Sequence, residues 1–285
     1  RMFVPYPGQV KIEDLLRGVI VQSGNDACVV LAEGLAGSEA AFVERMNATA
    51  EKLGLTNSHF ANVHGLPAPG HYMSPRDLTM LSRHLIQDFP QYYRYEAEKE
   101  FTYNGVKQGN RNPLLYRNIG ADGIKTGHTE EAGYGLVGSA IRSGRRVIVM
   151  LSGMSSMKER DVESEKVLEW AYREFNDYTI GKAGEPIDEA PVWLGAHAKV
   201  PAAPAEDLVV TLPRAARRDL KVMAVYDGAV KAPIAKGQTV GKLVVTAPDT
   251  DTIETPLVAT QAVDRLDALS RVGVGVGYLL LGHKN

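Results

Sequence analysis

Residues 122–129 read Asp122-Gly123-Ile124-Lys125-Thr126-Gly127-His128-Thr129, and a second short motif, Ser23-Gly24-Asn25, lies far upstream of them. Either motif alone is an ordinary turn sequence, because Gly and Asn adopt backbone conformations that other residues avoid. The information lies in their order, their separation and their flanking residues. We expect the two motifs to place a hydroxyl, a carboxamide and an ammonium group at one cleft.

The residue types in these motifs suit acyl transfer, which needs groups that relay a proton, stabilise an oxyanion and hold the substrate. The Ser23 hydroxyl both donates and accepts hydrogen bonds, and the Asn25 carboxamide can pair with a peptide group. Lys125 supplies a cation and Thr126 a short hydroxyl for a terminal carboxylate. Gly127 has no side chain, so an extended substrate can lie against this strand as an added strand.

The flanking residues give the chain a family resemblance. Residues 22–28, 64–66, 110–112 and 122–129 are all similar to the corresponding strings of one family. The chain resembles the low-molecular-mass penicillin-binding proteins of the D-alanyl-D-alanine carboxypeptidase type. The resemblance covers nearly all of residues 1–285 and implies a penicillin-binding/β-lactamase-like transpeptidase domain, of α+β class, followed by a small all-β domain.

This resemblance implies a function. Such proteins are serine-type carboxypeptidases that remove the terminal D-alanine from peptidoglycan stem peptides through an acyl-enzyme, and β-lactams acylate them. The expected partners are therefore a stem peptide ending in D-Ala-D-Ala and β-lactam inhibitors, and no cofactor is expected. The expected location is the bacterial periplasm, peripheral on the outer face of the inner membrane, with a role in the cell wall and cell shape.

The resemblance also implies roles for individual residues. Ser23, Asn25 and Lys125 are the expected catalytic residues, and Ser23 passes a proton between the base and the leaving amine. The backbone N–H of His128 is expected to be one oxyanion donor. His64 is expected to shape the floor of the site. The residues expected to bind substrate are Lys125, Thr126, Gly127, His128, Arg111 and Arg160, of which the two arginines add positive charge for the carboxylate.

The nucleophile of this family belongs to a third signature, Ser-x-x-Lys, which lies upstream of the Ser-x-Asn motif. Residues 1–22 do not contain it, so we expect it on a segment upstream of Arg1. The chain also begins without an initiator Met or a signal peptide, which suggests a fragment of a longer precursor. Residues 155–158, Ser-Ser-Met-Lys, fit the signature literally but follow Lys125, and we interpret them as the passage from a strand into a helix.

Two other functions are consistent with some of these features. A class A β-lactamase needs a Glu on a loop between the second and third motifs, and no Glu-x-x-x-Asn string is found there. β-Lactamases also lack a second β domain. A non-catalytic cell-wall-binding or scaffold protein that kept the cleft without its nucleophile remains an alternative, which a search of the parent polypeptide for Ser-x-x-Lys would test.

Charge, cysteine count and histidine spacing argue against a nucleic-acid partner, an intrachain disulfide and a metal site. The net charge of -2 and pI near 6.4 leave no basic face for a nucleic acid. The run 214–218, with Arg214, Arg217 and Arg218, is interpreted as a solvated loop. A single cysteine, Cys28, permits no disulfide within the chain. The histidines of residues 59–71 lack metal-ligand spacing, so no metal is predicted.

The pattern along the chain predicts three parts, at 1–176, 177–262 and 263–285. In the first part, apolar spacing predicts helices near 10–20, after a cap at Asp26, from Ser38 to Gly54, from Ser74 to about 88 and around 167–175. Residues 55–73 are predicted to form an irregular loop. Asn104-Gly105 and Ser143-Gly144 predict hairpins, and residues 124–127 a short strand.

The second and third parts contain no group of residues whose types and spacing are typical of a catalytic site. Alternating segments at 191–194, 208–212, 220–226, 242–246 and 253–260 predict a small all-β domain. Residues 263–285 have apolar positions close to helical spacing, but the apolar run is well short of the ~20 residues that span a bilayer. The family resemblance implies that this tail is an amphipathic helix that anchors the protein on the membrane surface.

Overall fold

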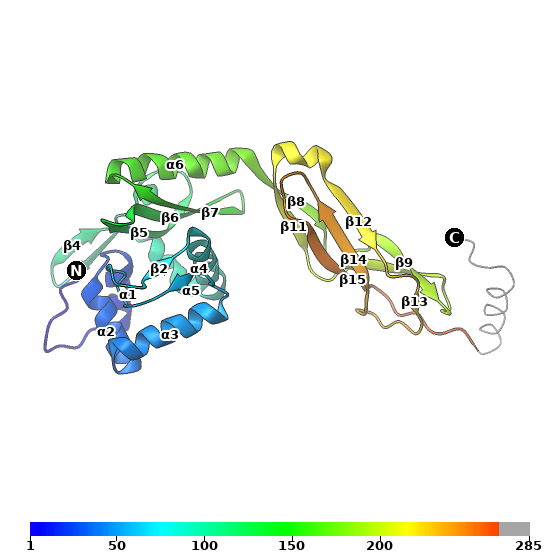
Figure 1. Ribbon diagram of the computed structural model, residues 1–285, viewed down its shortest axis with the longest axis horizontal. Helices are drawn as coiled ribbons and strands as arrows, with labels where there is room; N and C mark the ends of the chain where they lie inside the picture. The colour runs from blue at the N-terminus through cyan, green and yellow to red at the C-terminus, as the bar shows by residue number, and fades with distance from the viewer. Residues whose placement is uncertain (268–285) are drawn as a thin grey trace. The chain divides into compact units, whose positions relative to one another are not determined.

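The computed structural model describes residues 1–267 and divides the chain into two compact units, Arg1–Tyr172 and Arg173–Asn285 (Figure 1). The change in sequence pattern suggested a boundary between residues 176 and 177. The structural boundary lies inside the last helix of the first unit, α6 (Met157–Glu174). The strand that follows, β8 (Phe175–Gly181), belongs to the second unit.

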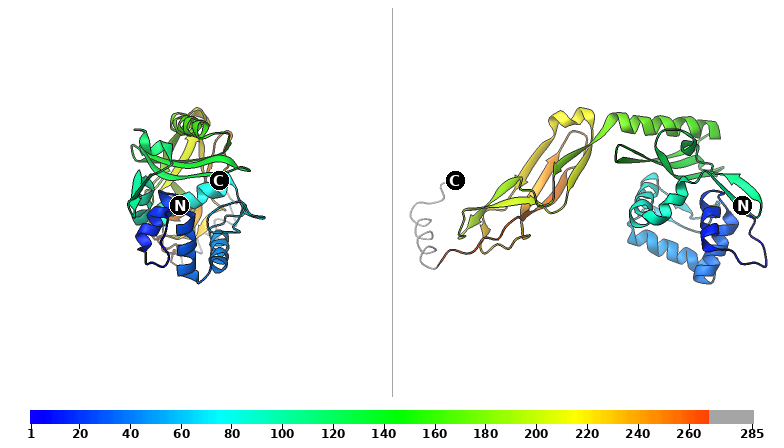
Figure 2. Two further views of the ribbon diagram at one scale, coloured as in Figure 1. Left: turned by 90° about the vertical axis from the view of Figure 1, so that its left-hand side faces the viewer. Right: turned by 180° about the vertical axis from the view of Figure 1, so that it is seen from behind.

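The first unit is built on a three-stranded antiparallel sheet of β5 (Ala121–Thr129), β6 (Gly133–Arg142) and β7 (Arg145–Met154). Helix α6 covers one face, where Leu168 packs with Leu114 and Leu136. Helix α4 (Pro75–Asp88) covers the other, where its leucines pack against Ile124 and Val137 (Figure 2). Helices packed on an antiparallel sheet confirm the predicted α+β class.

Three further helices complete the helical part, namely α1 (Ile12–Ile20), α2 (Asn25–Ala36) and α3 (Glu39–Lys52). Two predicted helix caps are present. The Ser38 hydroxyl accepts from the N–H of Ala41 at 3.1 Å, and the Ser74 hydroxyl accepts from the N–H of Asp77 at 3.1 Å. Each satisfies a backbone donor that a helix start would otherwise leave without a partner.

The cap predicted at Asp26 is wrong. Helix α2 starts at Asn25, and its N-cap is Gly24, two residues before Asp26. The Asp26 carboxylate instead accepts the backbone N–H groups of Met2, Phe3 and Val4 at 2.9, 2.7 and 3.2 Å. Three backbone N–H groups at the start of the chain bind the carboxylate instead. These groups are distant in sequence, so the residues next to Asp26 do not reveal them.

Smaller elements connect the helices to the sheet. The predicted hairpin is present as β3 (Glu100–Tyr103) and β4 (Val106–Gly109), and Asn104 and Gly105 both have positive φ, 46° and 76°. The predicted irregular loop contains a two-stranded pairing of β1 (Ser58–His59) with β2 (Tyr72–Met73). The remaining short helices are α5 (Pro90–Tyr93), η1 (Arg94–Ala97) and η2 (Pro113–Tyr116).

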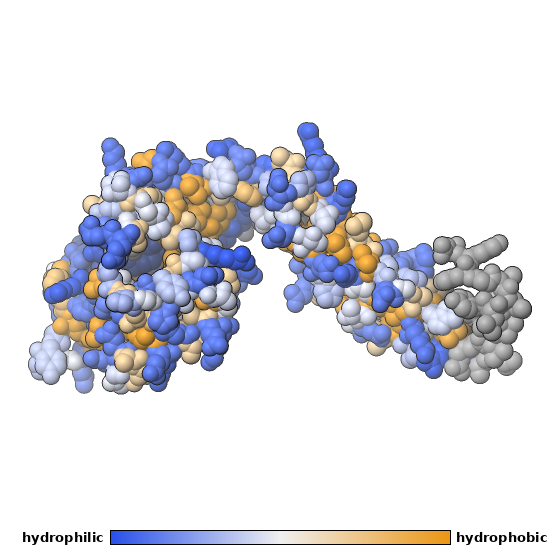
Figure 3. Space-filling model, in the orientation of Figure 1, coloured by the Kyte–Doolittle hydropathy of each residue, from blue (hydrophilic) through white to orange (hydrophobic). Residues whose placement is uncertain are grey.

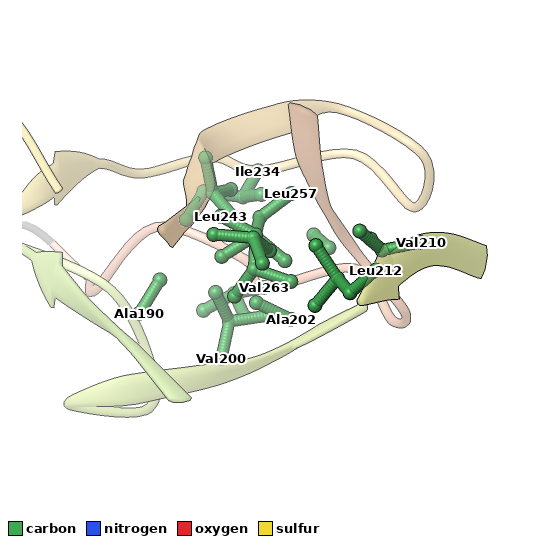
Figure 4. Packing of buried hydrophobic residues seen from close by; sticks show 12 residues of the cluster. Ala190, Val200, Ala202, Val210, Leu212, Ile234, Leu243, Leu257 and Val263 are labelled. Atoms are coloured by element: carbon green, nitrogen blue, oxygen red, sulfur yellow. The ribbon is translucent and has the colours of Figure 1, made fainter. Parts of the chain in front are cut away.

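The second unit is a small all-β domain, as predicted. Its main sheet has the order β12-β14-β15-β10-β9-β13, and β11 pairs with β8. Leu212, Leu243 and Leu257 belong to its buried core, shown in Figure 4. Its other elements are β9 (Asp188–Trp193), β10 (Lys199–Pro204), β11 (Leu208–Pro213), η3 (Arg214–Asp219), β12 (Lys221–Val225), β13 (Val230–Lys231), β14 (Thr239–Thr246) and β15 (Ile253–Ala259).

The end of the described chain is tied into this domain. Val263 is 1% exposed, and its N–H and C=O exchange hydrogen bonds with Ile234, both at 2.9 Å. The tail predicted from residue 263 therefore begins with residues that pack in the β core. The rest of it, residues 268–285, lies outside the described residues. Within residues 1–267, no helix is both long and apolar enough to cross a bilayer.

Candidate active site

The two motifs meet in the folded chain. The Lys125 ammonium, on β5, donates to the Ser23 hydroxyl at 3.0 Å and to the Thr126 carbonyl at 3.0 Å. Ser23 lies on the turn between α1 and α2, so this hydrogen bond joins the helical part of the unit to the sheet. The visible face of the unit is hollowed below the sheet, with hydrophilic side chains around the hollow (Figure 3).

The backbone holds Ser23 in an unusual conformation. Its φ of 53° lies in the left-handed region, which costs a residue other than glycine roughly 1–2 kcal/mol. The N–H of Gly24 donates to the Gly18 carbonyl at 2.9 Å and fixes the turn. A Cβ on Gly24 would lie 3.1 Å from Met2 and from the Asp26 carboxylate, so glycine fits best there. The surrounding contacts thus aim the Ser23 hydroxyl at Lys125.

The site changes the ionisation of Lys125. Burial, together with the positive charges of Arg111 and Arg160, lowers the pKa of Lys125 to about 8, although Glu96 and Cys28 oppose this change. The ammonium is therefore easier to deprotonate than an ordinary lysine. A lysine with a pKa close to physiological pH can take part in proton transfer as well as attract an anion.

Two groups near Lys125 were missed by sequence reasoning. Glu96, on η1, is 6% exposed, and burial raises its pKa to about 7 against the opposing charge of Lys125. Cys28, on α2, is partly buried, which raises the pKa of its thiol, although Lys125 opposes the change. Neither residue type marks a chemical motif at its position in the sequence.

The open side of β5 has room for a ligand. Strand β5 pairs only with β6 among the described residues, so its other edge carries unpaired backbone groups. A Cβ added to Gly127 would meet nothing within 4 Å, and His128 is exposed. The Thr126 side chain, in contrast, is 9% exposed. The strand is therefore open at Gly127, where an extended peptide can lie against it.

The two predicted arginines lie together, and Arg160 is close to the residues around His128. The Arg160 guanidinium, 7% exposed, donates to the Arg111 carbonyl at 3.3 Å, and its Nε has no partner in the described residues. It lies 5.7 Å from the ring centroid of Tyr134, which also packs against the His128 ring at 3.9 Å. Tyr134 was not predicted, although hairpin pairing places it opposite His128.

Two predicted residues take less part in these contacts. Asn25 is the first residue of α2, and within the described chain its carboxamide has no hydrogen-bond partner. His64 accepts from the N–H of Leu66 at 3.2 Å and lies 3.8 Å from the Glu39 carboxylate. In residues 1–267, no hydrogen bond or ion pair joins His64 to the Ser23–Lys125 pair.

Ser155, the first residue of the Ser-Ser-Met-Lys string, has hydrogen-bond partners at the start of α6. Its hydroxyl donates to the Glu159 carboxylate at 2.6 Å, and its N–H donates to the same oxygen at 2.7 Å, just before α6. Ser156 accepts from the N–H of Glu159 at 3.1 Å. These bonds cap the start of α6 in a variant of the capping box, in which Ser156 accepts the Glu159 N–H and the Glu159 carboxylate binds the preceding residue, Ser155. Among the described residues, no group of three or more His, Cys, Asp or Glu is arranged to hold a metal ion.

Comparison with known proteins gives the same assignment. Residues 1–155 match the family described as D-alanyl-D-alanine carboxypeptidase. The chain belongs to this family. Residues 175–265 match the C-terminal domain of penicillin-binding protein 5. The match to the carboxypeptidase family thus includes both the Ser23 turn and strand β5.

Individual members of the carboxypeptidase family are similar along most of the chain. The D-alanyl-D-alanine carboxypeptidase DacA of Escherichia coli (strain K12) is 43% identical over 244 residues, which cover 85% of this chain and 60% of DacA. DacD of the same strain is 39% identical over 273 residues, covering 95% of this chain and 70% of DacD. The chain therefore spans about 60% of the length of DacA.

Solved structures of the family have the same fold. The structure of penicillin-binding protein 5 from Haemophilus influenzae superimposes with a TM-score of 0.84 at 40% identity, and covers 93% of this chain and 78% of that one. The similarity includes both units, since so much of the chain is covered. Membership of the carboxypeptidase family thus rests on both sequence and fold.

Proposed function

We propose that the protein is a serine-type D-Ala-D-Ala carboxypeptidase that acts on peptidoglycan stem peptides and is acylated by β-lactams. The observation that carries the proposal is the hydrogen bond from Lys125 to Ser23, because it joins two motifs that are separated in sequence into one proton-relay unit. Family membership supports the same reaction.

Substrate binding follows from the positions of the charged groups. The stem peptide lies along the free edge of β5 beside Gly127, with its terminal carboxylate toward Lys125, Thr126 and the two arginines, Arg111 and Arg160. The Asn25 carboxamide has no partner in the described chain and pairs with a substrate peptide group. The N–H of His128 donates to the carbonyl oxygen that becomes the oxyanion.

The reaction proceeds in two steps. A serine hydroxyl attacks the carbonyl carbon of the penultimate D-alanine, so an ester bond forms and the peptide bond to the terminal D-alanine breaks. Ser23 passes a proton to the departing amine, with Lys125 holding the Ser23 hydroxyl. Water then cleaves the ester and restores the serine. This scheme requires the Ser-x-x-Lys serine of the family, which residues 1–22 do not provide.

The decisive experiment uses a longer polypeptide, in which a segment with the Ser-x-x-Lys motif precedes Arg1. Incubation with a fluorescent penicillin is expected to give a covalent adduct on that serine, and a D-Ala-D-Ala peptide is expected to release D-alanine. Ser155→Ala is the matched control and should change neither result, because the Ser155 hydroxyl is engaged with the Glu159 carboxylate at the start of α6. Residues 1–285 alone should give no adduct by intact-mass spectrometry.

The outcomes separate the alternatives. An adduct on Ser155 would contradict the proposed order of motifs. Absence of both adduct and D-alanine release from the polypeptide with the motif would favour a non-catalytic wall-binding protein. Fast hydrolysis of the penicillin without release of D-alanine would favour a β-lactamase.

We also propose that the protein works in the periplasm and contacts the inner membrane through the part of the predicted tail 263–285 that follows residue 267. The apolar and basic residues of this segment support the proposal, since such tails bind anionic lipid surfaces. Co-sedimentation with anionic vesicles tests it, using forms that end at residue 267 and at residue 285. Equal binding by the two forms would contradict the membrane contact.

A further inference from the structure

Glu96 carries a buried carboxylate that forms no hydrogen bond at one of its oxygens in the part of the chain that the structure describes. Its side chain is 6% exposed, and Oε2 is fully buried with no hydrogen-bond donor among the described residues. Burial of an unpaired carboxylate is costly, so such groups usually have a counter-charge or a functional reason to be present. The proposed function so far makes no use of this residue.

The surroundings prevent Glu96 from turning toward water. Its neighbours Tyr93 and Tyr95 are 7% and 4% exposed. The Tyr95 hydroxyl donates to Glu13 at 2.9 Å, which ties η1 to α1. Glu96 also packs against β5, because its Cβ lies only 3.2 Å from the point that a Cβ on Gly123 of this strand would occupy. The carboxyl group is therefore fixed beside the strand that carries Lys125.

The carboxylate that β5 itself contributes, Asp122, already has partners. Asp122 pairs with Arg146 at 2.7 Å and accepts from the Tyr93 hydroxyl at 2.9 Å. The charge that Glu96 interacts with is that of Lys125, and each of the two groups favours the charged form of the other. Lys125 has three N–H donors, and two of them donate to the Ser23 hydroxyl and to the Thr126 carbonyl.

We propose that Glu96 is a positioning residue that acts through Lys125, because its buried carboxylate keeps the ammonium charged while that group donates to the Ser23 hydroxyl. The inference rests on the proposed function for its effect on rate, but the coupling between the two side chains can be measured without turnover. Arg111 and Arg160 oppose the ammonium, and Glu96 is the carboxylate that offsets them.

The ionisation of the pair gives the proposal a pH range. Burial raises the pKa of Glu96 to about 7, and the pKa of Lys125 is lowered to about 8. Below pH 7 the carboxyl group takes up a proton and gives no support, while above pH 8 the ammonium loses its proton. The partly buried Cys28 thiol also faces Lys125 and has a raised pKa, so it stays neutral in this range.

The first measurement is a titration of Lys125 in the chain 1–285, by ¹³Cε NMR with labelled lysine, and Lys125→Arg identifies the signal. Glu96→Gln is expected to lower the pH at which Lys125 titrates by about one unit, the size expected for loss of a nearby opposite charge. Glu96→Asp should restore part of the difference. Glu100→Gln is the matched control, since Glu100 is exposed and pairs with Lys107.

The second measurement uses the polypeptide with the Ser-x-x-Lys motif. In Glu96→Gln, the alkaline limb of the pH profile for penicillin acylation should shift to lower pH. The shift should equal the decrease in the pH at which Lys125 titrates. A purely structural role would lower the rate at every pH without moving the profile, and thermal melting would reveal misfolding.

The results separate this inference from the proposed function. An unchanged Lys125 titration in folded Glu96→Gln, or in Glu96→Asp if Glu96→Gln does not fold, overturns the inference. A shifted titration in a protein that neither binds penicillin covalently nor releases D-alanine leaves the coupling in place and overturns the proposed function. A shifted titration with an unshifted rate profile shows that the coupling does not act on the reaction, and the positioning role is then wrong.

Discussion

Lys125 is the residue on which the chemistry of the site converges, and its charge depends on its surroundings. Burial lowers its pKa to about 8, so the ammonium form is lost near that pH. We expect acylation by penicillin to fall as the pH rises through about 8, because the cation that binds the carboxylate and holds Ser23 disappears. Stopped-flow acylation rates between pH 6 and 10 test this, and a rate that stays constant to pH 10 contradicts it.

Substitution of Lys125 gives a related prediction. Lys125→Ala should lose most of the activity, because both the charge and the hydrogen bond to Ser23 are removed. Lys125→Arg should recover only part, since a planar guanidinium does not reproduce a compact ammonium. Steady-state release of D-alanine distinguishes the two variants. Full activity in Lys125→Ala would mean that the side chain is only a buried strand residue.

Ser23 is expected to act as the proton relay. Ser23→Ala should slow acylation and deacylation by roughly 10²–10⁴, the usual contribution of a positioned acid or base. The fold should survive with stability close to that of the parent protein, because alanine keeps the Cβ and therefore the same strain at the left-handed turn. Rates measured beside a melting curve test this, and unchanged turnover excludes the relay role.

At the scale of elements, the first residues of the chain are fastened to the Ser23 turn by Asp26. Burial alone would raise the pKa of Asp26, but the N–H groups of Met2, Val4 and Phe3 outweigh it and lower the pKa. A carboxylate with a lowered pKa stabilises the fold above its ordinary value of about 3.9, and this contribution is lost as the pH falls through the lowered value.

Asp26→Asn is therefore expected to reduce the free energy of unfolding by about 1–3 kcal/mol at pH 7. The difference from the parent protein should persist down to about pH 4 and vanish at lower pH. Urea unfolding at several pH values measures it, with Glu33→Gln on the exposed side of the same helix as the control. A difference that is equally large at pH 2 would exclude the carboxylate as its cause.

Elements with strong local signals could be predicted from the sequence. Ser74 before Pro75 gave the start of α4, and Asn104-Gly105 gave the first hairpin. Strand β8 was missed because it follows α6 without a turn, and β10 because prolines weigh against a strand. Asp26 was misassigned, since its partners lie 22 to 24 residues away. Local patterns give no information about such distant competition.

The site could be predicted only where motifs mark it. Ser23 and Lys125 carry family signatures, so their meeting was expected, and the hydrogen bond between them is what the structure adds. Glu96 and Tyr134 reach the same region through tertiary packing and the register of β5 with β6. Burial converts an ordinary glutamate into a group with a pKa near 7, and burial is not visible in the residue type.

At the scale of the whole molecule, the extent of the second unit yields a direct prediction. A form ending at residue 262 should be less stable in this unit than a form ending at residue 267. The shorter form lacks the buried Val263 and the Arg265 side chain, whose Nε donates to the Ala232 carbonyl at 3.1 Å. Loss of the Val263 side chain alone costs about 1.5–3 kcal/mol. Thermal unfolding of the two forms tests this, and equal melting temperatures would contradict it.

The pairing of the last described residues also decides how the second unit bears mechanical load. Val263 exchanges two hydrogen bonds with Ile234, the Ala196 N–H donates to the Asp264 carbonyl at 2.8 Å, and the Leu266 N–H donates to the Leu194 carbonyl at 2.9 Å. A pull on the chain beyond residue 267 would therefore be shared among several hydrogen bonds and a buried side chain. Tension from a tether at this end would be spread into the β core, and the unit would resist unravelling from its terminus.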